Sequence, residues 1–561
     1  MLLSVFSFLL FIIALSSISL AEADQKLSGP SFELPTHVLS NKAIQEAVLS
    51  IRSSLNGAIR TGRSHFGRFN SSTTSFSLTA VSQLESTPII DFHHTSNFLN
   101  VSAGSRSKVT SDTVYQISSV SKLFTVYSLF LNNGTNYWNR PVTDFIPELR
   151  QASHPPLHKS SVVDRVQWDQ TTVGALASQL SGIGRDYSSG DLSSQDFPWT
   201  ELGLPALPPQ DIPSCGINDN QLPCSRKGKS YEELVKKEIF EPLGMKHSSP
   251  LPPIGRGIGI IPNGDAGWGR EYGDEIATGG LLSSTNDLTK FGCAIFADKQ
   301  LPSMETLRWM KPSSLTSSTS LFLGAPWEIV RTRSGIKTGH LIDLYTKSGS
   351  VGSYESLLIL IPDYQVTLAV LAAGPDASAA LRAVTETAIQ TLLPSLKKAA
   401  KAESCSKLCG DYAPAGASRN SSLAITVDDG PSLLVKEWIH QGHDLIAAGQ
   451  AYANATRGGK IQALRLYPTG LRTRRQAAYR VLFESIPCQY DPSVYLVFDP
   501  KAGVWGKLDQ LMYGGIAVDG FVFHLNSGGD SAAVEPRVLR EVYQRLEKSY
   551  VCSRVQLHKT I

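Results

Sequence analysis

The chain has 561 residues, of which 42% are hydrophobic, so it is long enough for several domains and at least one large core. Its 52 basic and 49 acidic residues give a formal net charge of +3 and form no basic block. This balance lacks the electrostatic footprint of nucleic-acid binding, and we expect no nucleic-acid partner.

The first 23 residues have the form of a secretory signal peptide. An apolar stretch from Phe8 to Leu15 is followed by small residues and by an A-x-A from Ala21 to Ala23. The start of this segment has no Lys or Arg, and the alternative is a single membrane anchor, which usually needs about 20 apolar residues. We therefore expect cleavage near Ala23 and a secreted protein without a stable membrane span.

Secretion would give a role to two further features of the sequence. Five N-x-[ST] sequons become candidate glycosylation sites, at Asn70, Asn100, Asn133, Asn420 and Asn454. Seven cysteines fit an oxidising compartment with one left over. The disulfides that we expect are Cys215–Cys224, Cys405–Cys409 and Cys488–Cys552, with Cys293 as a buried thiol.

The pattern of apolar residues divides the rest of the chain. Residues 24–79 form a lead-in, with a helix followed by strands. Residues 80–395 carry long helical patterns such as KLFTVYSLFLNN and SYEELVKKEIFEPLG, and end in the strand-like runs YTKSGSV, SLLILIP and QVTLAVLAAG before a helical segment. Strands in hairpin order between helical segments predict a mixed α/β (α+β) domain with an antiparallel sheet under helical cover.

The C-terminal part changes both composition and period. Residues 396–410 are rich in Lys, Ala and Ser and are predicted to be an interdomain linker. Residues 411–561 contain short alternating segments, such as SLAITV, AYRVLFESI and GFVFHLN, separated by Gly, Pro, Asn and Asp. This pattern predicts a small all-β domain.

A search for catalytic motifs first excludes several enzyme classes. The chain has no G-x-S-x-G, H-E-x-x-H, GxxxxGK[ST] or GxGxxG. The pair His93-His94 lacks further ligands at helical spacing and is better explained as the end of a strand. We therefore expect no metal and no cofactor.

The pattern S-x-x-K recurs along the chain and needs context to be informative. Ser119 with Lys122 is the only pair that opens a long apolar helix. Residues three apart share one face of a helix, so Lys122 can reach the Ser119 hydroxyl and accept its proton. Taken alone, the two residues are equally well explained as an ordinary helix start. Other such pairs, in polar stretches or near the linker, include Ser105–Lys108, Ser395–Lys398 and Ser404–Lys407.

Serine acyl transfer of this type also needs a K-[ST]-G on a strand beside the nucleophile. The candidates are Lys337-Thr338-Gly339 and Lys347-Ser348-Gly349, and the second is preferred because it lies within the strand YTKSGS. Lys347 would bind a substrate carboxylate or tune Lys122, and Ser348 and Gly349 would line the substrate. The backbone N–H groups of Ser119 and Ser350 are the expected oxyanion donors, each worth about 3 kcal/mol in other serine enzymes.

Five segments together resemble a known family: ISSVSKLFTV, LASQLSGIGRD, SYEELVKKEIFEPLGMKHS, GGLLSSTNDLTKFG and YTKSGSVGSYESLLILIPDY. They are similar to the serine β-lactamase and penicillin-binding-protein superfamily, over roughly residues 80–395, and more narrowly to its secreted fungal branch with an extra C-terminal domain. The resemblance implies a β-lactamase/transpeptidase-like fold with a helical subdomain and an acyl-serine mechanism. It leaves the substrate open, since relatives include esterases, peptidases and acyltransferases.

The sequence departs from the family at its second motif, Y-x-N, which in relatives supplies a tyrosine base. The tyrosines between Ser119 and Glu241 are at positions 127, 137, 187 and 231. Only Tyr137 has Asn two residues later, and it lies just after the Ser119 helix, not before the segment SYEEL, where relatives carry the motif. Three explanations are open: a segment of roughly 40 residues is missing from this version of the sequence, Tyr187 is a substitute base, or the base has been lost. The close match of the flanking segments favours the first.

Two functions of different classes follow from these observations. The first is a secreted serine hydrolase or acyltransferase that acts on a small-molecule ester, amide or thioester, with a role in tailoring fungal secondary metabolites. The second is a catalytically weak or inactive homologue that binds a ligand. The sequence carries no signal for an oligomeric state.

Overall fold

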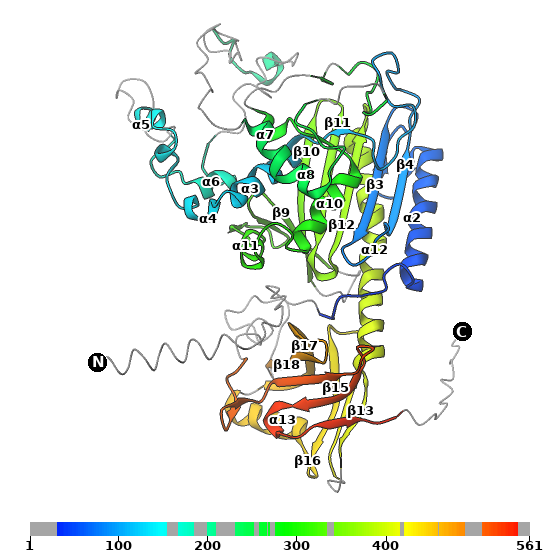
Figure 1. The fold of residues 1–561 in the computed structure, drawn as a ribbon, viewed down its shortest axis with the longest axis vertical. Helices are drawn as coiled ribbons and strands as arrows, with labels where there is room; N and C mark the ends of the chain where they lie inside the picture. The colour runs from blue at the N-terminus through cyan, green and yellow to red at the C-terminus, as the bar shows by residue number, and fades with distance from the viewer. Residues whose placement is uncertain are drawn as a thin grey trace.

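The computed structural model describes residues 31–153, 166–183, 199–208, 230–251, 257–265, 267–269, 275–333, 341–415, 420–457, 459–487 and 508–547. They form a mixed helix–sheet domain and a β-barrel domain, joined by the 32-residue helix α12 (Ala377–Leu408) (Figure 1). The segment predicted as a signal peptide lies outside the described residues. Among the described residues, no helix combines the length and hydropathy needed to cross a bilayer.

The first domain is built on an eight-stranded antiparallel sheet. Strand β3 near the N-terminus pairs with β12 over eight residues, from Ser75–Ala373 to Ser82–Val366, so the two ends of the domain pair directly, as the second and third strands from one edge of the sheet. Strands β10 and β11 form a hairpin that turns at Gly352, whose φ of +54° favours glycine. The strand order is β4 (Ile90–His94), β3 (Ser75–Ser82), β12 (Val366–Ala373), β11 (Tyr354–Ile361), β10 (Leu341–Val351), β9 (Glu328–Arg333), β8 (Leu321–Leu323), β7 (Ser314–Leu315).

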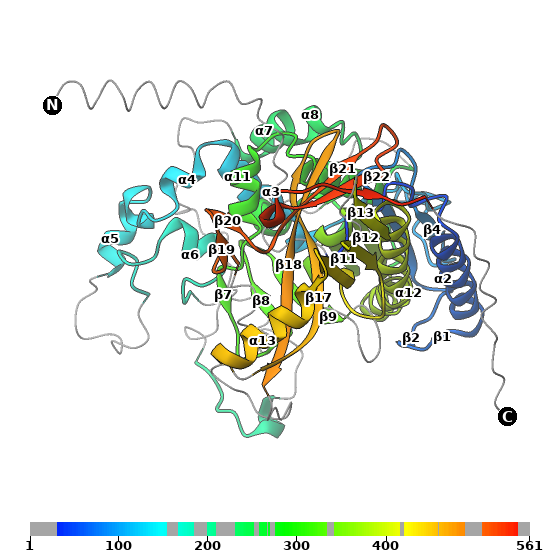
Figure 2. The ribbon, with the colours of Figure 1, turned by 90° about the horizontal axis from the view of Figure 1, so that it is seen from below.

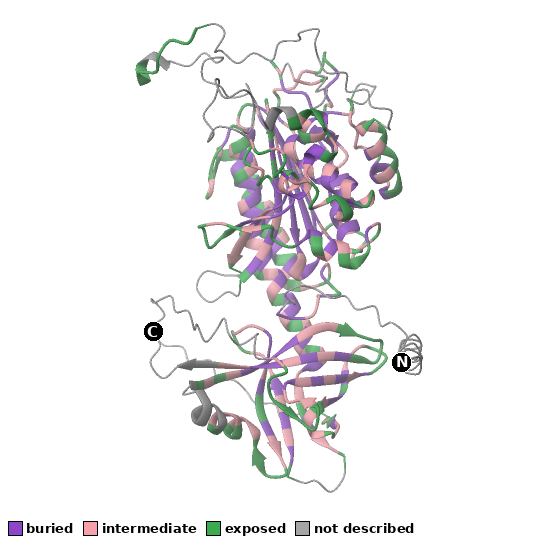
Figure 3. Cartoon of the chain, turned by 90° about the vertical axis from the view of Figure 1, so that its left-hand side faces the viewer, coloured by how far each residue is buried: buried purple, intermediate pink, exposed green. Residues whose placement is uncertain are grey.

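Helices cover both faces of this sheet, and the sequence of β12 reflects this. All eight residues of β12 are buried, because alternate side chains enter different cores. Leu368 and Val370 join one core with α2 (Lys42–Thr61) and α12, while Ala369 and Leu371 join the other with α3 (Ser121–Leu131) and α10 (Thr285–Phe296). Figures 1 and 2 show α2 and α12 on one side of the sheet, and Figure 3 shows the buried strands between the helical layers. The predicted antiparallel sheet with helical cover is confirmed.

The second core holds the helix that carries the predicted nucleophile. Aromatic side chains fix α3 in place: Phe124 stacks on Phe291 at 4.4 Å between ring centroids, and Tyr127 lies 5.3 Å from Trp309. Such pairs add to the stabilisation from apolar burial. The other helices of this domain are short: α4 (Gly134–Tyr137), α5 (Glu148–Ser153), α6 (Val173–Ala177), α7 (Tyr231–Val235), α8 (Glu241–Leu243), α9 (Ile276–Gly279) and α11 (Ser303–Trp309).

The second domain is a closed barrel. Its strands run in the order β14-β13-β23-β22-β21-β18-β17-β15-β16, where β16 is the short strand His443–Asp444. Strand β14 also pairs with β15, so the sheet closes on itself. The predicted all-β C-terminal domain is confirmed, with one addition, the helix α13 (Leu445–Arg457). The strands are β13 (Gly410–Pro414), β14 (Ser422–Thr426), β15 (Leu433–His440), β17 (Gly459–Arg472), β18 (Gln476–Pro487), β21 (Gly520–Leu525), β22 (Ser531–Pro536) and β23 (Tyr543–Arg545).

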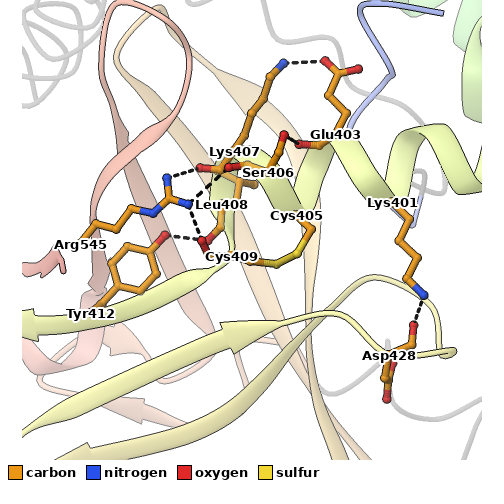
Figure 4. Close-up of a disulfide and its surroundings, with 10 residues drawn as sticks. All are labelled: Lys401, Glu403, Cys405, Ser406, Lys407, Leu408, Cys409, Tyr412, Asp428 and Arg545. Atoms are coloured by element: carbon orange, nitrogen blue, oxygen red, sulfur yellow. Dashed lines mark hydrogen bonds and ion pairs between the residues drawn. A yellow bond between two sulfur atoms is a disulfide. The ribbon is translucent and has the colours of Figure 1, made fainter. Parts of the chain in front are cut away.

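The junction between the domains is helical and cross-linked. Residues 396–408 of the predicted linker are the last turns of α12, which ends at the disulfide Cys405–Cys409, as predicted (Figure 4). The Arg545 guanidinium on β23 donates to the carbonyl oxygens of residues 406, 407 and 409, and the Tyr412 hydroxyl donates to that of residue 408. Carbonyls left without partners at the helix end are thereby satisfied from the barrel.

Of the other predicted cysteine roles, the structure describes only that of Cys293. The pairs Cys215–Cys224 and Cys488–Cys552 lie outside the described residues. Cys293, on α10, has a free thiol and is only partly exposed. Burial raises the pKa of this thiol, while a hydrogen bond with Thr367 opposes the shift.

Candidate active site

The predicted nucleophile lies in a strained turn that leads into α3. Ser119 belongs to the 3₁₀ turn η2 (Ser118–Val120) and is partly exposed, with buried residues on either side. Ser118 has a φ of +43°, which is costly for a residue other than glycine and persists only where neighbours hold it. One such contact is the hydrogen bond that the Ser118 hydroxyl donates to the carbonyl oxygen of Ser350 on β10, at 2.8 Å.

Lys122 lies one turn after Ser119, on the same face of the helix. Its Nζ is 2.9 Å from the Ser119 Oγ and 2.8 Å from the carbonyl oxygen of Thr278, on α9. The lysine therefore contacts the hydroxyl as the spacing predicts. The carbonyl at Thr278, which the sequence did not indicate, orients the Lys122 amino group toward the serine.

The Lys347-Ser348-Gly349 segment lies on β10 directly beside this turn. A Cβ added to Gly349 would lie 2.5 Å from the carbonyl oxygen of Ile117 and 2.8 Å from the amide nitrogen of Ser119. The Ser356 hydroxyl on β11 donates to the same Ile117 oxygen at 2.7 Å. Strands β10 and β11 thus hold the nucleophile turn by hydrogen bonds from serine hydroxyls to backbone carbonyls, and only glycine fits at position 349.

The side chains of the K-S-G segment face different surroundings. Lys347 is buried, and its Nζ lies 2.5 Å from Oε1 of Glu328, at the start of β9. Ser348 is exposed and donates both its N–H and its hydroxyl to Oε2 of the same glutamate, at 3.0 and 2.8 Å. Glu328 was not identified from the sequence, because its partners become neighbours only when β9 pairs with β10.

Ser350 brings a second carboxyl group to this edge of the sheet. Its hydroxyl donates to Oε1 of Glu355, the residue opposite it on β11, at 2.8 Å. Burial raises the pKa of Glu355 above its ordinary value, and the hydrogen bond from Ser350 partly offsets this shift. The other predicted K-T-G, Lys337-Thr338-Gly339, lies outside the described residues.

The other tyrosines between Ser119 and Glu241 have partners away from the nucleophile. The Tyr231 hydroxyl lies 2.9 Å from the Thr125 Oγ1, which in turn donates to the carbonyl oxygen of Ala277. Tyr127 is buried among aromatic rings, and Tyr137 packs edge-on against Phe145. Burial raises the pKa of both Tyr127 and Tyr231 well above the ordinary value, which favours the neutral phenol. Tyr187 lies outside the described residues.

A second grouping of serine, histidine and aspartate occurs in the core. His93 Nδ1 lies 3.0 Å from the Ser77 Oγ, and the opposite ring nitrogen lies 3.0 Å from Asp91. Ser77 has no exposed surface and also contacts the Tyr115 hydroxyl, so this grouping is structural. Across the described part of the chain, no three or more His, Cys, Asp or Glu side chains are arranged to hold a metal ion.

The predicted glycosylation sites differ in exposure. Asn70, Asn133 and Asn420 are exposed, and Asn100 is partly buried. The side chain of Asn454 lies outside the described residues. Glycosylation at these positions stays a prediction.

Comparison with known families gives two matches that follow each other along the chain. Residues 220–390 match the family model "Beta-lactamase", and residues 400–547 match "Beta-lactamase-like-like, C-terminal domain". The K-S-G segment lies inside the first match, whereas Ser119 and Lys122 precede it.

Similar proteins are found in fungi. A "Beta-lactamase-like protein" of Arthroderma benhamiae is 26% identical over 592 aligned positions, which cover 92% of this chain and 96% of the relative. The "Probable hydrolase M10" of a Phoma species is 22% identical over 69% of each chain. Because 592 positions exceed the length of this chain, the Arthroderma protein has residues without a counterpart here.

Among solved structures, an octameric penicillin-binding protein homologue from Pyrococcus abyssi aligns with 88% of this chain and 99% of its own length, at 17% identity and a TM-score of 0.41. The two consecutive family matches agree with the two domains of the fold. The chain thus carries a β-lactamase domain of a hydrolase family, followed by the C-terminal barrel domain of β-lactamase-like proteins.

Proposed function

We propose that this protein is a serine hydrolase or acyltransferase that forms an acyl-Ser119 intermediate with an ester, amide or thioester. The observation that carries the proposal is the 2.9 Å contact between Lys122 Nζ and the Ser119 Oγ, beside Gly349 of the K-S-G strand. Ser119 is partly exposed and can be reached by a substrate. A nucleophile in contact with its base, at a strained turn, is the arrangement that covalent catalysis requires.

In the acylation step, the Ser119 Oγ bonds to the substrate carbonyl carbon while neutral Lys122 accepts the hydroxyl proton. The carbonyl oxygen becomes an oxyanion, which the N–H groups of Ser119 and Ser350 stabilise. The bond to the leaving group then breaks, and the proton on Lys122 passes to the leaving atom. Attack by water releases an acid, whereas attack by an alcohol or amine completes acyl transfer.

The K-S-G strand positions this chemistry. Ser348 and Ser350 are exposed beside Gly349, so they line the place where the acyl group would lie. Removing one oxyanion donor in other serine enzymes reduces kcat by about a hundred- to a thousandfold.

The absence of a Y-x-N motif before the segment SYEEL limits the rate expected from this sequence. Proton transfer by a positioned base contributes about a hundred- to ten-thousandfold to a rate. Acylation of Ser119 should therefore be easier to detect than turnover.

The proposed cellular location and reaction type rest on the sequence and on the relatives. The expected signal peptide, sequons and disulfides support secretion, and the "Probable hydrolase" relatives support a hydrolytic reaction. We also propose a tailoring role in fungal secondary metabolism. The second candidate is a ligand-binding homologue, which the missing motif favours; it predicts ligand binding without a covalent adduct.

The test is to react the full chain with a fluorophosphonate and record its intact mass. We expect one reagent equivalent on the wild type and none on Ser119→Ala. Ser395→Ala is a matched control, because Ser395 belongs to another S-x-x-K pair but lies on α12, and it should label like the wild type. A folded wild type without adduct would refute the proposal and favour ligand binding.

A further inference from the structure

The K-S-G lysine already has an internal counter-ion. The Lys347 side chain is only 4% exposed, and its ammonium lies 2.5 Å from Glu328 Oε1 and 2.9 Å from the carbonyl oxygen of Ser348. The sequence predicts Lys347 as an anchor for the substrate, for example through a substrate carboxylate. In the structure, the Lys347 ammonium is paired with the carboxylate of Glu328.

The pairing of the strands explains how Glu328 reaches this place. Glu328 is the first residue of β9 and lies opposite Thr346, whose hydroxyl donates to the Glu328 carbonyl oxygen at 2.6 Å. Ser348 extends two residues beyond this last pair, where β9 offers no further backbone partner. The Glu328 side chain continues the strand edge, because its Oε2 accepts the Ser348 N–H at 3.0 Å.

Glu328 therefore contributes a negative charge beside Ser348, the residue next to Gly349 on the K-S-G strand. Its side chain is 32% exposed, and its Oε2 also accepts the hydroxyl of the exposed Ser348 at 2.8 Å. A substrate carboxylate that approaches Lys347 would meet this like charge. It would also have to displace Glu328 from a buried ammonium, and breaking such a pair is costly.

We infer that the site selects acyl substrates without a carboxylate next to the reacting carbonyl, such as neutral esters, thioesters or amides. This inference rests on the proposed function, since it concerns the substrate of the same Ser119. Glu328 is in this view a specificity-determining residue, which acts by neutralising Lys347 and repelling anions.

The experiment compares two reagents that differ in one charge: benzylpenicillin, which carries a carboxylate, and its methyl ester. The rate of adduct formation is measured by intact mass for the wild type, Ser119→Ala and Glu328→Gln. For each protein, the rate of adduct formation with the ester is divided by the rate with the acid. This ratio is then divided by the ratio of the rates at which hydroxide hydrolyses the two reagents, which corrects for their intrinsic reactivity. Glu437→Gln is a matched control, because Glu437 on the barrel strand β15 also accepts a serine hydroxyl, that of Ser422.

We expect the corrected ratio to favour the ester by about tenfold or more in the wild type and in Glu437→Gln. In Glu328→Gln, which keeps the shape but leaves Lys347 charged, the ratio should fall to one or below. A wild type that reacts equally well with both reagents, or better with the acid, overturns the inference and leaves the proposed function standing. A folded wild type that forms no adduct with these reagents or with a fluorophosphonate overturns both. If Glu328→Gln does not fold, the corrected ester-to-acid ratio of the wild type alone decides whether the inference holds.

Discussion

Replacement of Gly349 by Ala tests whether the K-S-G strand positions the nucleophile. The added methyl carbon would lie 2.5 Å from the Ile117 oxygen, 2.6 Å from the Ser356 Oγ and 2.8 Å from the Ser119 nitrogen. All three distances are below 3.0 Å, and two of the atoms belong to the backbone, so the turn itself must shift. Overpacking of this kind costs about 1–3 kcal/mol of stability.

The effect on activity should exceed the effect on stability. A displacement of about 1 Å at a reacting centre can reduce a rate about a hundredfold. We therefore expect Gly349→Ala to fold, with a lower Tm, and to react with a fluorophosphonate about a hundredfold more slowly than the wild type. Labelling is followed by intact mass against time, and folding by circular dichroism.

A matched substitution separates this effect from a general effect of alanine. Gly57 lies on α2, and a Cβ there would meet no atom within 4 Å. Gly57→Ala should keep the labelling rate and raise the stability by up to about 1 kcal/mol, because alanine favours a helix. If Gly349→Ala labels as fast as the wild type, the contact between β10 and the nucleophile turn does not position Ser119.

Arg545→Ala removes the donor to three helix-end carbonyls and should lower the stability by about 2–3 kcal/mol, measured by urea unfolding; an unchanged midpoint would mean that water replaces these bonds. Asp287→Ala removes a fully buried carboxylate that accepts the N–H of residue 247 and pairs with Lys290, and should cost about 3–5 kcal/mol; a loss below 1 kcal/mol would contradict this. The hydrogen bond from Arg465 lowers the pKa of Asp428 below its ordinary 3.8, so this pair stabilises the barrel above that pH and loses its effect as the pH falls toward the lowered value. Asp428→Asn should therefore flatten the acid limb of a thermal-unfolding profile, and an unchanged limb would exclude this pair as its cause.

The sequence predicted the parts of the fold that depend on local pattern. The hairpin runs from position 341 to 373 became strands, and the alternation after position 411 became the barrel, since both follow a period of two. The helix α13 was not predicted, and the helix α12 was not expected to extend to Leu408 through a segment rich in Lys and Ala. Propensity alone did not distinguish a helical junction from a flexible one.

The candidate site was predicted only where its residues are close in the sequence. The spacing of Ser119 and Lys122 is local, and it predicts their contact because one helical turn separates them. Glu328 and Thr278 reach the site through strand pairing and helix packing, over long separations that a single sequence does not encode as a pattern. The roles predicted for Lys347 and Ser350 stay predictions.

The continuous helix α12 bears on how the protein can be divided. The two family matches end and begin at residues 390 and 400, within the helix rather than at a boundary between folded units. One apolar core runs along α12 from the sheet into the barrel, through Leu396 and Leu408 to Tyr412 and Trp438. A protein shortened at residue 395 would lose helical turns whose apolar side chains this core buries. We therefore expect the two domains to unfold in a single thermal transition, and we expect enzymatic studies to require the whole chain.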